Sequence, residues 1–206
     1  MKPTILRASI ALIIACVPAA WAINIDLSGA TTGTLITAPG GSFAQTFAGQ
    51  SVSGIHLTGS PTAPLTLLPS GILTVEFFNG TNTILPQPGN TAPLSLLLDQ
   101  AANSITWTMG FGNPPSSVKI DFFADNGSLV NSITQSILVG YNTYSYSGFG
   151  NFEGLSISDN NDPFGLRFYN FSYTPGVPDG GSSAGLLALS VIALAGFAKR
   201  LKAFRA

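Results

Sequence analysis

The sequence predicts an all-β protein, an antiparallel β-sandwich of the jelly-roll type, placed between two terminal segments of different character. Two observations indicate this fold. Between residues 23 and 175, no stretch of about ten residues has the periodicity of an amphipathic helix. Instead, roughly ten short runs of alternating or apolar residues follow one another and are separated by turn residues, as in sandwiches and barrels.

The first well-defined hairpin is expected at Asn79-Gly80. Residues 73–78 form an apolar and aromatic run before this dipeptide, and residues 81–85 form the returning run. Asn and Gly both tolerate the positive φ that two-residue hairpin turns require. Another strand is expected at residues 94–99.

The clearest strand covers residues 104–111, where apolar side chains alternate with small or polar ones. This period of two is typical of a strand with one buried face. The apolar set is Ile105, Trp107, Met109 and Phe111. After Pro114 and Pro115, further strands are expected at 118–123, 128–138, 141–147, 153–158 and 166–174, with a turn at 125–127.

The N-terminus has the three parts of a cleaved secretory signal. Lys2 and Arg7 make the start basic, residues 8–17 are apolar, and Ala20 and Ala22 provide a small-x-small site for signal peptidase. We expect cleavage after Ala22.

Lipidation is the alternative at this end. Residues 13–16 loosely resemble a lipobox, in which Cys16 would carry the lipid and become the first residue. Cleavage after Ala22 instead leaves a mature chain without cysteine, and therefore without disulfides or thiolate metal sites.

The C-terminus has the pattern of a membrane span. Residues 180–198 contain no charge, and as a helix they would be about 28 Å long, close to the thickness of the hydrocarbon core. The basic residues that follow keep this end in the cytoplasm, so the body lies outside. They are Lys199, Arg200, Lys202 and Arg205. A buried C-terminal helix would not predict this basic end, and we expect a transmembrane helix at about residues 182–198.

A short motif stands just before this span. It consists of Val177, Pro178, Asp179, Gly180 and Gly181, followed by Ser182. Motif, apolar helix and basic tail (199–206) in this order resemble the PEP-CTERM sorting signal, in particular the variant that reads Val-Pro-Asp-Ser-Gly. The resemblance implies recognition by an exosortase, cleavage near the motif and transfer to the envelope or to exopolysaccharide. The chain thus divides into a signal peptide (1–22), a body (23–175) and a sorting signal (176–206).

The second half of the body also resembles the lectin-like β-sandwich found in many PEP-CTERM proteins. The matching pieces are the turn 125–127, the glycine-aromatic segment 147–150 and the last strand segment 169–173. Tyr169 stands where that family often has an acidic residue, so a role that depends on the carboxylate does not carry over.

The body is acidic. Lys119 and Arg167 are its only basic residues, against eight Asp and Glu residues, which leaves a net charge of −6. Nucleic-acid-binding proteins present basic patches to the phosphate backbone. We therefore expect no nucleic-acid partner.

No set of residues forms a recognisable active site, and we expect no catalytic residue. His56 is the only histidine, and no Gly-x-Ser-x-Gly elbow accompanies it. A glycosidase needs two opposed carboxylates, and Glu76 and Glu153 are the only glutamates. Solvated carboxylates on a polar face are the simpler interpretation of these two.

A calcium site is one interpretation of the segment that contains Asp159, Asn161 and Asp162, because calcium prefers hard oxygen ligands. The other interpretation is an Asx-rich turn, which the same residue types form through local hydrogen bonds. No other cofactor is expected.

A cluster of tyrosines offers a candidate glycan contact. Tyr141, Tyr144 and Tyr146 present flat aromatic faces that suit sugar rings. Aromatic residues in strands also fill the cores of sandwiches, which is the alternative interpretation.

Together these features predict an exported, exosortase-sorted, non-catalytic protein of the cell envelope or extracellular matrix, associated with exopolysaccharide. It would be anchored transiently in the inner membrane with its body outside the cytoplasm, and then reach the cell surface or the matrix. The first alternative is a carbohydrate-binding module with a defined glycan site and a structural calcium ion. The second is a surface glycosidase.

Overall fold

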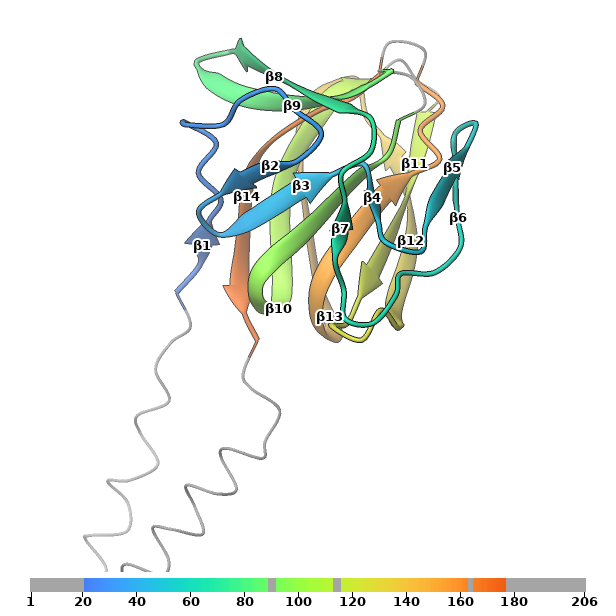
Figure 1. Cartoon of the computed structure of the whole chain (residues 1–206). Coiled ribbons are helices and arrows are strands. Elements are labelled where there is room, and N and C mark those ends of the chain that lie inside the picture. The colour runs from blue at the N-terminus through green and yellow to red at the C-terminus, as the bar shows by residue number, and fades with distance from the viewer. Residues whose placement is uncertain (1–20, 89–91, 113–115, 163–164, 177–206) are drawn as a thin grey trace, which may run out of the picture.

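The computed structural model describes residues 21–88, 92–112, 116–162 and 165–176 (Figure 1). Nearly all of the predicted signal peptide and the whole of the predicted sorting motif, transmembrane helix and basic tail lie outside these residues. Within the described ranges, the regular elements are strands. These ranges contain no helix with the length and apolar character needed to cross a bilayer.

All the strand pairings described are antiparallel, which confirms the all-β, antiparallel part of the predicted fold class. The strands are β1 (Ile23–Asn24), β2 (Ile36–Ala38), β3 (Gly41–Ala44), β4 (Thr46–Phe47), β5 (Ser51–Ser53), β6 (His56–Thr58), β7 (Leu67–Leu68), β8 (Ile72–Phe78), β9 (Thr81–Gln87), β10 (Leu94–Gly112), β11 (Ser116–Phe123), β12 (Leu129–Ile137), β13 (Gly140–Ser158) and β14 (Arg167–Pro175).

Two long strands, β10 and β13, each combine two runs that the sequence predicts as separate strands. Residues 94–98 of β10 pair with β3 and with the last part of β13, whereas residues 104–110 pair with β14 and with the first part of β13. The register is irregular between Leu97 and Ala102, where β10 turns. Gly148 and Gly150 have φ of 87° and 91°, which lets β13 turn at the matching place. The alternation of inward and outward side chains restarts after each turn. The sequence pattern of each long strand therefore looks like two separate strands.

These turns divide the sheet into two layers. The first layer consists of β2, β3, residues 94–98 of β10, residues 154–158 of β13, β11 and β12. The second layer consists of β8, β9, β14, residues 102–112 of β10 and residues 140–147 of β13. β1 also pairs with β14, so the chain enters and leaves the fold at the same end (Figure 1).

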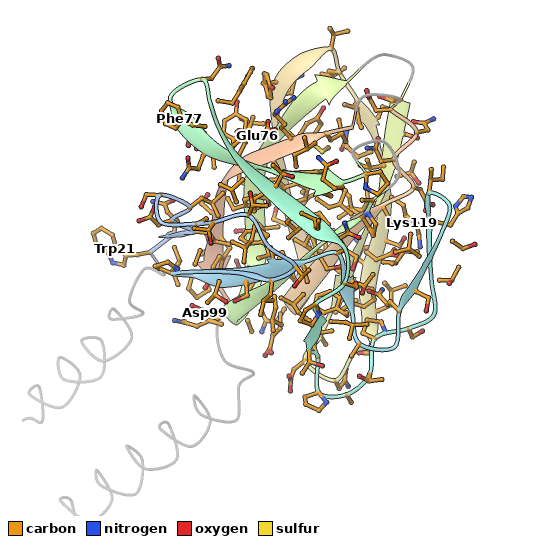
Figure 2. The ribbon with its side chains drawn as sticks, turned by 45° about the horizontal axis from the view of Figure 1, so that its top comes forward. Trp21, Glu76, Phe77, Asp99 and Lys119 are labelled. Carbon is orange, nitrogen blue, oxygen red and sulfur yellow. The ribbon has the colours of Figure 1, made fainter. Side chains whose placement is uncertain are left out.

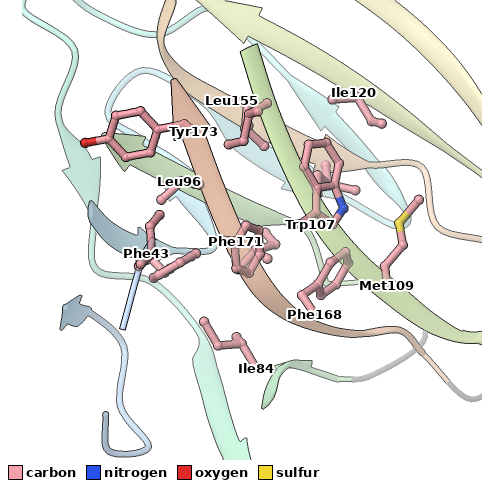
Figure 3. Packing of buried hydrophobic residues seen from close by; sticks show 14 of the residues in the cluster. Phe43, Ile84, Leu96, Trp107, Met109, Ile120, Leu155, Phe168, Phe171 and Tyr173 are labelled. Carbon is pink, nitrogen blue, oxygen red and sulfur yellow. The ribbon is translucent and has the colours of Figure 1, made fainter. Parts of the chain in front are cut away.

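The inner faces of the two layers meet in one aromatic core (Figure 3). Phe43 from the first layer contacts Phe171 from the second, with ring centroids 5.0 Å apart. Trp107, which is fully buried, stacks on Tyr146 at 4.8 Å. Ile105 and Met109 are buried beside it, as the period of two predicts. The molecule is therefore a β-sandwich.

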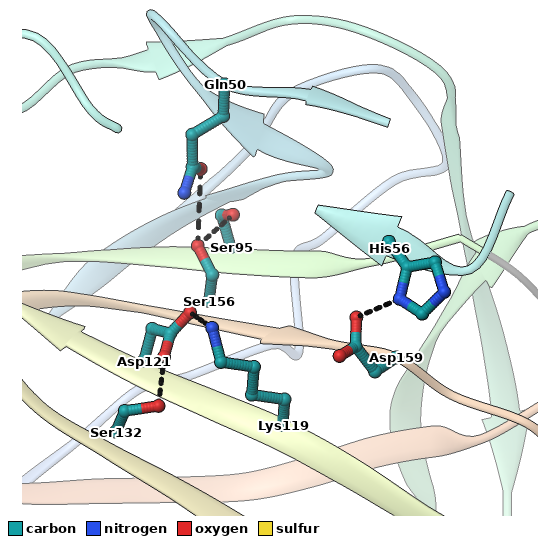
Figure 4. Close-up of polar contacts among 8 residues, drawn as sticks. All are labelled: Gln50, His56, Ser95, Lys119, Asp121, Ser132, Ser156 and Asp159. Atoms are coloured by element: carbon teal, nitrogen blue, oxygen red, sulfur yellow. Dashed lines mark hydrogen bonds and ion pairs between the residues drawn. The ribbon is translucent and has the colours of Figure 1, made fainter. Parts of the chain in front are cut away.

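Residues 45–68, which we call the covering segment, bury the part of the outer face of the first layer around Ser95, Phe123 and Ser156. Phe47 of this segment packs edge-on against Phe123, and Leu65 completes this small cluster. Beneath it, the hydroxyls of Ser95 and Ser156 hydrogen-bond to each other at 2.9 Å, and the Ser156 hydroxyl also donates to Gln50 (Figure 4). Both serines are fully buried, so their hydroxyls depend on these partners.

Candidate functional site

The outer face of the second layer is open to solvent and carries hydroxyl and amide groups. Thr106 lies between Ser145 and Ser172 on the neighbouring strands, and Thr108 lies between Thr143 and Tyr169. Side-chain hydrogen bonds of 2.9 Å and 3.1 Å join Thr106 to Ser145 and Thr108 to Thr143. We call this surface the open face; its members are Thr106, Thr108, Thr143, Ser145, Asn170 and Ser172.

The open face follows from the strand period. Ile105, Trp107 and Met109 point into the core, so the residues between them point outward. Threonine is favoured in strands and presents a hydroxyl to water, which keeps the outer face polar without charge. Thr143 and Ser145 are exposed and Thr106 is half-buried, whereas Thr108 is buried between its neighbours.

Two adjoining hollows lie along this surface. The first has a volume of about 500 Å³ and is lined by Asn24, Ile25, Thr106, Thr108, Thr143, Asn170, Phe171 and Ser172. The second has a volume of about 660 Å³ and is lined by residues 24–28, Phe77, Gly80, Thr81, Asn82 and Asn170. The two hollows share Asn24, Ile25 and Asn170, so they adjoin one another.

Asn170 stands between the hollows because β14 bulges there. Thr106 pairs with Ser172 and Thr108 with Tyr169, so two residues of β14 oppose the single Trp107 of β10. Asn170 takes a positive φ of 53°, which Asn tolerates better than most residues. Its exposed amide is thereby placed at the junction of the two hollows.

The β8–β9 hairpin forms one wall of the second hollow. Asn79 and Gly80 both have positive φ, which confirms the predicted turn. The Asn82 amide donates to the carbonyl oxygens of Leu27 (2.7 Å) and Ser28 (3.2 Å), which holds the hairpin against the N-terminal segment. Phe77 projects from this hairpin and is 76% exposed (Figure 2).

A cluster of aromatic and charged residues lies at the other end of the open face. The Arg167 guanidinium donates to the Glu76 carboxylate at 3.0 Å and lies 5.2 Å over the Phe78 ring. Phe78 contacts Tyr141, and Tyr141 contacts Tyr169, with ring centroids 5.4 Å and 5.6 Å apart. We call Phe78, Tyr141 and Tyr169 the aromatic cluster. Tyr169 pairs with Thr108, so this cluster adjoins the open face.

The two tyrosines of this cluster are neutral at physiological pH. Burial raises the pKa of Tyr141, although Arg167 beside it acts in the opposite direction. Burial also raises the pKa of Tyr169. Their phenol groups therefore keep the proton.

The predicted tyrosine contacts divide between the two sides of the sheet. Tyr141 lies on the outer side, whereas Tyr144 and Tyr146 are buried in the core. Burial raises the pKa of Tyr146, whose hydroxyl donates to Gln135, and the Tyr144 hydroxyl accepts a hydrogen bond from the Leu138 amide. The strand period separates Tyr141 from the other two, because odd and even positions of this strand face opposite ways.

Two other members of the site, Tyr169 and Phe78, were not predicted from the sequence. Tyr169 joins Tyr141 only through the pairing of β14 with β10 and of β10 with β13, a register that no local pattern contains. Phe78 reaches the same cluster from the β8–β9 hairpin. The alternation at residues 104–111 did indicate that Thr106 and Thr108 point away from the core.

The segment with Asp159, Asn161 and Asp162 has partners within the chain. The Asn160 side chain accepts a hydrogen bond from the Asp162 amide at 3.0 Å, which is the Asx-turn alternative. Asn161 accepts from the Ser117 amide, and Asp159 contacts His56 at 3.3 Å (Figure 4). Among the residues that the structure describes, no three His, Cys, Asp or Glu side chains are grouped to hold a metal ion.

The structure does not bring the two glutamates together as an opposed pair. Glu76 contacts Arg167 beside the open face. Glu153 lies near the turn of β13, where burial and, secondly, the nearby Asp125 raise its pKa. The two carboxylates therefore belong to different surroundings.

No family model matches this sequence, and no curated protein matches it. Among solved structures, a variant of the family 29 carbohydrate-binding module CBM29-2 complexed with mannohexaose is 17% identical, covers 76% of this chain and 93% of its own, and has a TM-score of 0.40. Another CBM29-2 variant is 18% identical with 76% and 94% coverage and a TM-score of 0.39. A structure described as carbohydrate-binding module family 29 is 18% identical with 76% and 90% coverage and a TM-score of 0.36.

Proposed function

We propose that the folded body is a non-catalytic carbohydrate-binding module whose glycan lies along the open face. The observation that carries this proposal is the combination of an exposed hydroxyl and amide surface with aromatic rings at its ends. Sugars expose many hydroxyls that both donate and accept hydrogen bonds, and threonine and asparagine side chains do the same. Aromatic rings supply the apolar contact for the flatter faces of the sugar rings.

The shape of the site fits a chain of sugars better than a single one. The two hollows share Asn170, and Phe77 borders the second of them. The aromatic cluster adjoins the first hollow through the pairing of Tyr169 with Thr108. The Asn24 and Asn170 amides border both hollows, so they can contact neighbouring sugar units. A polysaccharide can therefore contact both ends of the site at once.

Binding of soluble polysaccharides to the full-length chain, purified in a detergent without a sugar headgroup, tests this proposal. Thr143→Val removes a hydroxyl of the open face and should weaken binding roughly threefold to tenfold. Thr134→Val is the matched control, because Thr134 is an exposed strand threonine of the first layer. Equal affinities of the two variants, or no retained glycan at all, would contradict the proposal.

We further propose that the terminal segments deliver this module to the cell surface or matrix. The support is the order of motif, apolar segment and basic tail, which resembles an exosortase signal, together with the signal-peptide pattern. Processing would release the body from its transient inner-membrane anchor and join it to the envelope or to exopolysaccharide. Mass spectrometry of the mature protein should find neither the signal peptide nor the residues after the motif. An intact C-terminus in cells that carry an exosortase would overturn the sorting proposal and leave the binding proposal standing.

A further inference from the structure

We infer that the open face selects uncharged polysaccharides, and that Glu76 enforces this selection by neutralising Arg167. This inference rests on the proposed function, since it concerns the ligand of the same site. It assigns Glu76 to specificity and not to catalysis.

The charges of the body disfavour the binding of acidic ligands. Its two cationic side chains each pair with a carboxylate: Lys119 with Asp121 at 2.7 Å in the first layer, and Arg167 with Glu76 at 3.0 Å in the second. With six more carboxylates, the body has a net charge of −6. An anionic polysaccharide approaching the body therefore meets a repulsive field.

The charges closest to the site also disfavour an anionic ligand. Asp26 lines the second hollow, and a hydrogen bond from the Ser28 amide lowers its pKa, so it is ionised at physiological pH. Glu76 offsets Arg167 at the aromatic end. A uronate carboxylate on the open face would thus gain no net attraction and would approach two carboxylates.

The contact between Glu76 and Arg167 is specific in its geometry. Both Nε and Nη2 of Arg167 donate to one oxygen of Glu76, at 3.2 Å and 3.0 Å. The guanidinium is also held over the Phe78 ring, and its side chain is only 20% exposed. The ring contact does not depend on the Glu76 charge, so it should keep Arg167 in place when that charge is removed.

Glu76→Gln is therefore the informative substitution. It keeps the size and an acceptor oxygen of the side chain and removes the negative charge beside Arg167. The matched control is Asp159→Asn, which makes the same charge change beyond the end of β13 in the first layer. Asp159 has a positive φ of 57°, a conformation that Asn also tolerates.

The test compares retention of an uncharged mannan or glucan with retention of polygalacturonate by affinity electrophoresis. The wild-type chain should retain a neutral polymer and not the polyuronate. Glu76→Gln should bind the polyuronate roughly three to ten times more tightly than Asp159→Asn does. This gain should fall at high salt, and it should disappear in the double variant Glu76→Gln/Arg167→Gln.

Each outcome separates the two proposals. If the wild-type chain retains polygalacturonate as well as the neutral polymers, the selectivity inference is wrong and glycan binding stands. If it retains neither kind of polymer, the proposed function itself fails. If it retains only neutral polymers but Glu76→Gln and Asp159→Asn behave alike while both melt cooperatively, the role assigned to Glu76 is wrong.

Discussion

The outer faces of the two layers carry similar hydroxyl residues, but one set is buried and the other is exposed to solvent. Ser95 and Ser156 on the first layer are fully buried beneath the covering segment and hydrogen-bond to each other. Thr106 and Ser145 on the second layer make a hydrogen bond of the same kind, yet Ser145 remains exposed. A hydroxyl on a strand thus becomes part of the interior or part of a binding surface according to what the chain lays over it.

The largest expected effect comes from removing the anchor of the covering segment. Phe47→Ala deletes a fully buried ring that packs on Phe123, so we expect it to lower the free energy of unfolding by about 3–5 kcal/mol. Phe77→Ala is the matched change on the exposed side and should alter it by less than about 0.5 kcal/mol. Urea unfolding measures both, and similar losses would show that the two faces are not different in kind.

The order of the two effects should be reversed for ligand binding, where Phe77→Ala should matter more than Phe47→Ala. Phe77 borders the second hollow, so Phe77→Ala should weaken polysaccharide binding by roughly tenfold. The measurement is affinity electrophoresis with the same neutral polymer. An unchanged affinity would limit the site to the first hollow and the aromatic cluster.

The buried and the exposed hydroxyl pairs can be compared in the same way, with a smaller expected effect on stability. Ser156→Ala removes a buried hydroxyl that hydrogen-bonds to Ser95 and donates to Gln50, and should cost about 1–2 kcal/mol of unfolding free energy. Ser145→Ala removes an exposed hydroxyl and should cost less than about 0.5 kcal/mol. Equal costs in chemical denaturation would contradict the assignment of the first face as interior.

The smallest expected effect depends on pH and distinguishes two carboxylates. The folded pKa of Glu153 is raised by burial and by Asp125, so the folded state holds this proton more tightly than the unfolded state does. Stability should therefore fall as pH rises past the ordinary glutamate value of 4.5. Glu153→Gln should remove this loss and raise stability at pH 7 by about 0.5 kcal/mol.

Asp26 should show the opposite sign. Its folded pKa is lowered by the hydrogen bond from Ser28, so its contribution to stability is present above the ordinary aspartate value and is lost as pH falls through the folded pKa. Asp26→Asn should therefore reduce the melting temperature slightly at pH 7 and have a smaller effect at pH 2. Melting curves at both pH values test the two signs, and the same sign for both variants would contradict them.

Some of the fold could be predicted because it depends on local chemistry. The alternation around Trp107 determined a strand with one buried side, and Asn79-Gly80 determined a tight hairpin, since few residues accept positive φ at both positions. The composition of the body determined its net charge, and with it the expectation that nucleic acid is not a partner. The terminal patterns predict export and sorting, and these stay predictions.

Only the tertiary structure decided which face is open and which residues share it. The covering segment consists of strands of two or three residues and loops, too short to show a period, and its position depends on packing against Phe123. Tyr141 and Tyr169 meet through a register between three strands, and Glu76 reaches Arg167 across 91 positions of sequence. A strand's own alternation specifies two sides, but whether a side becomes core, covered face or binding surface depends on what the rest of the chain places against it.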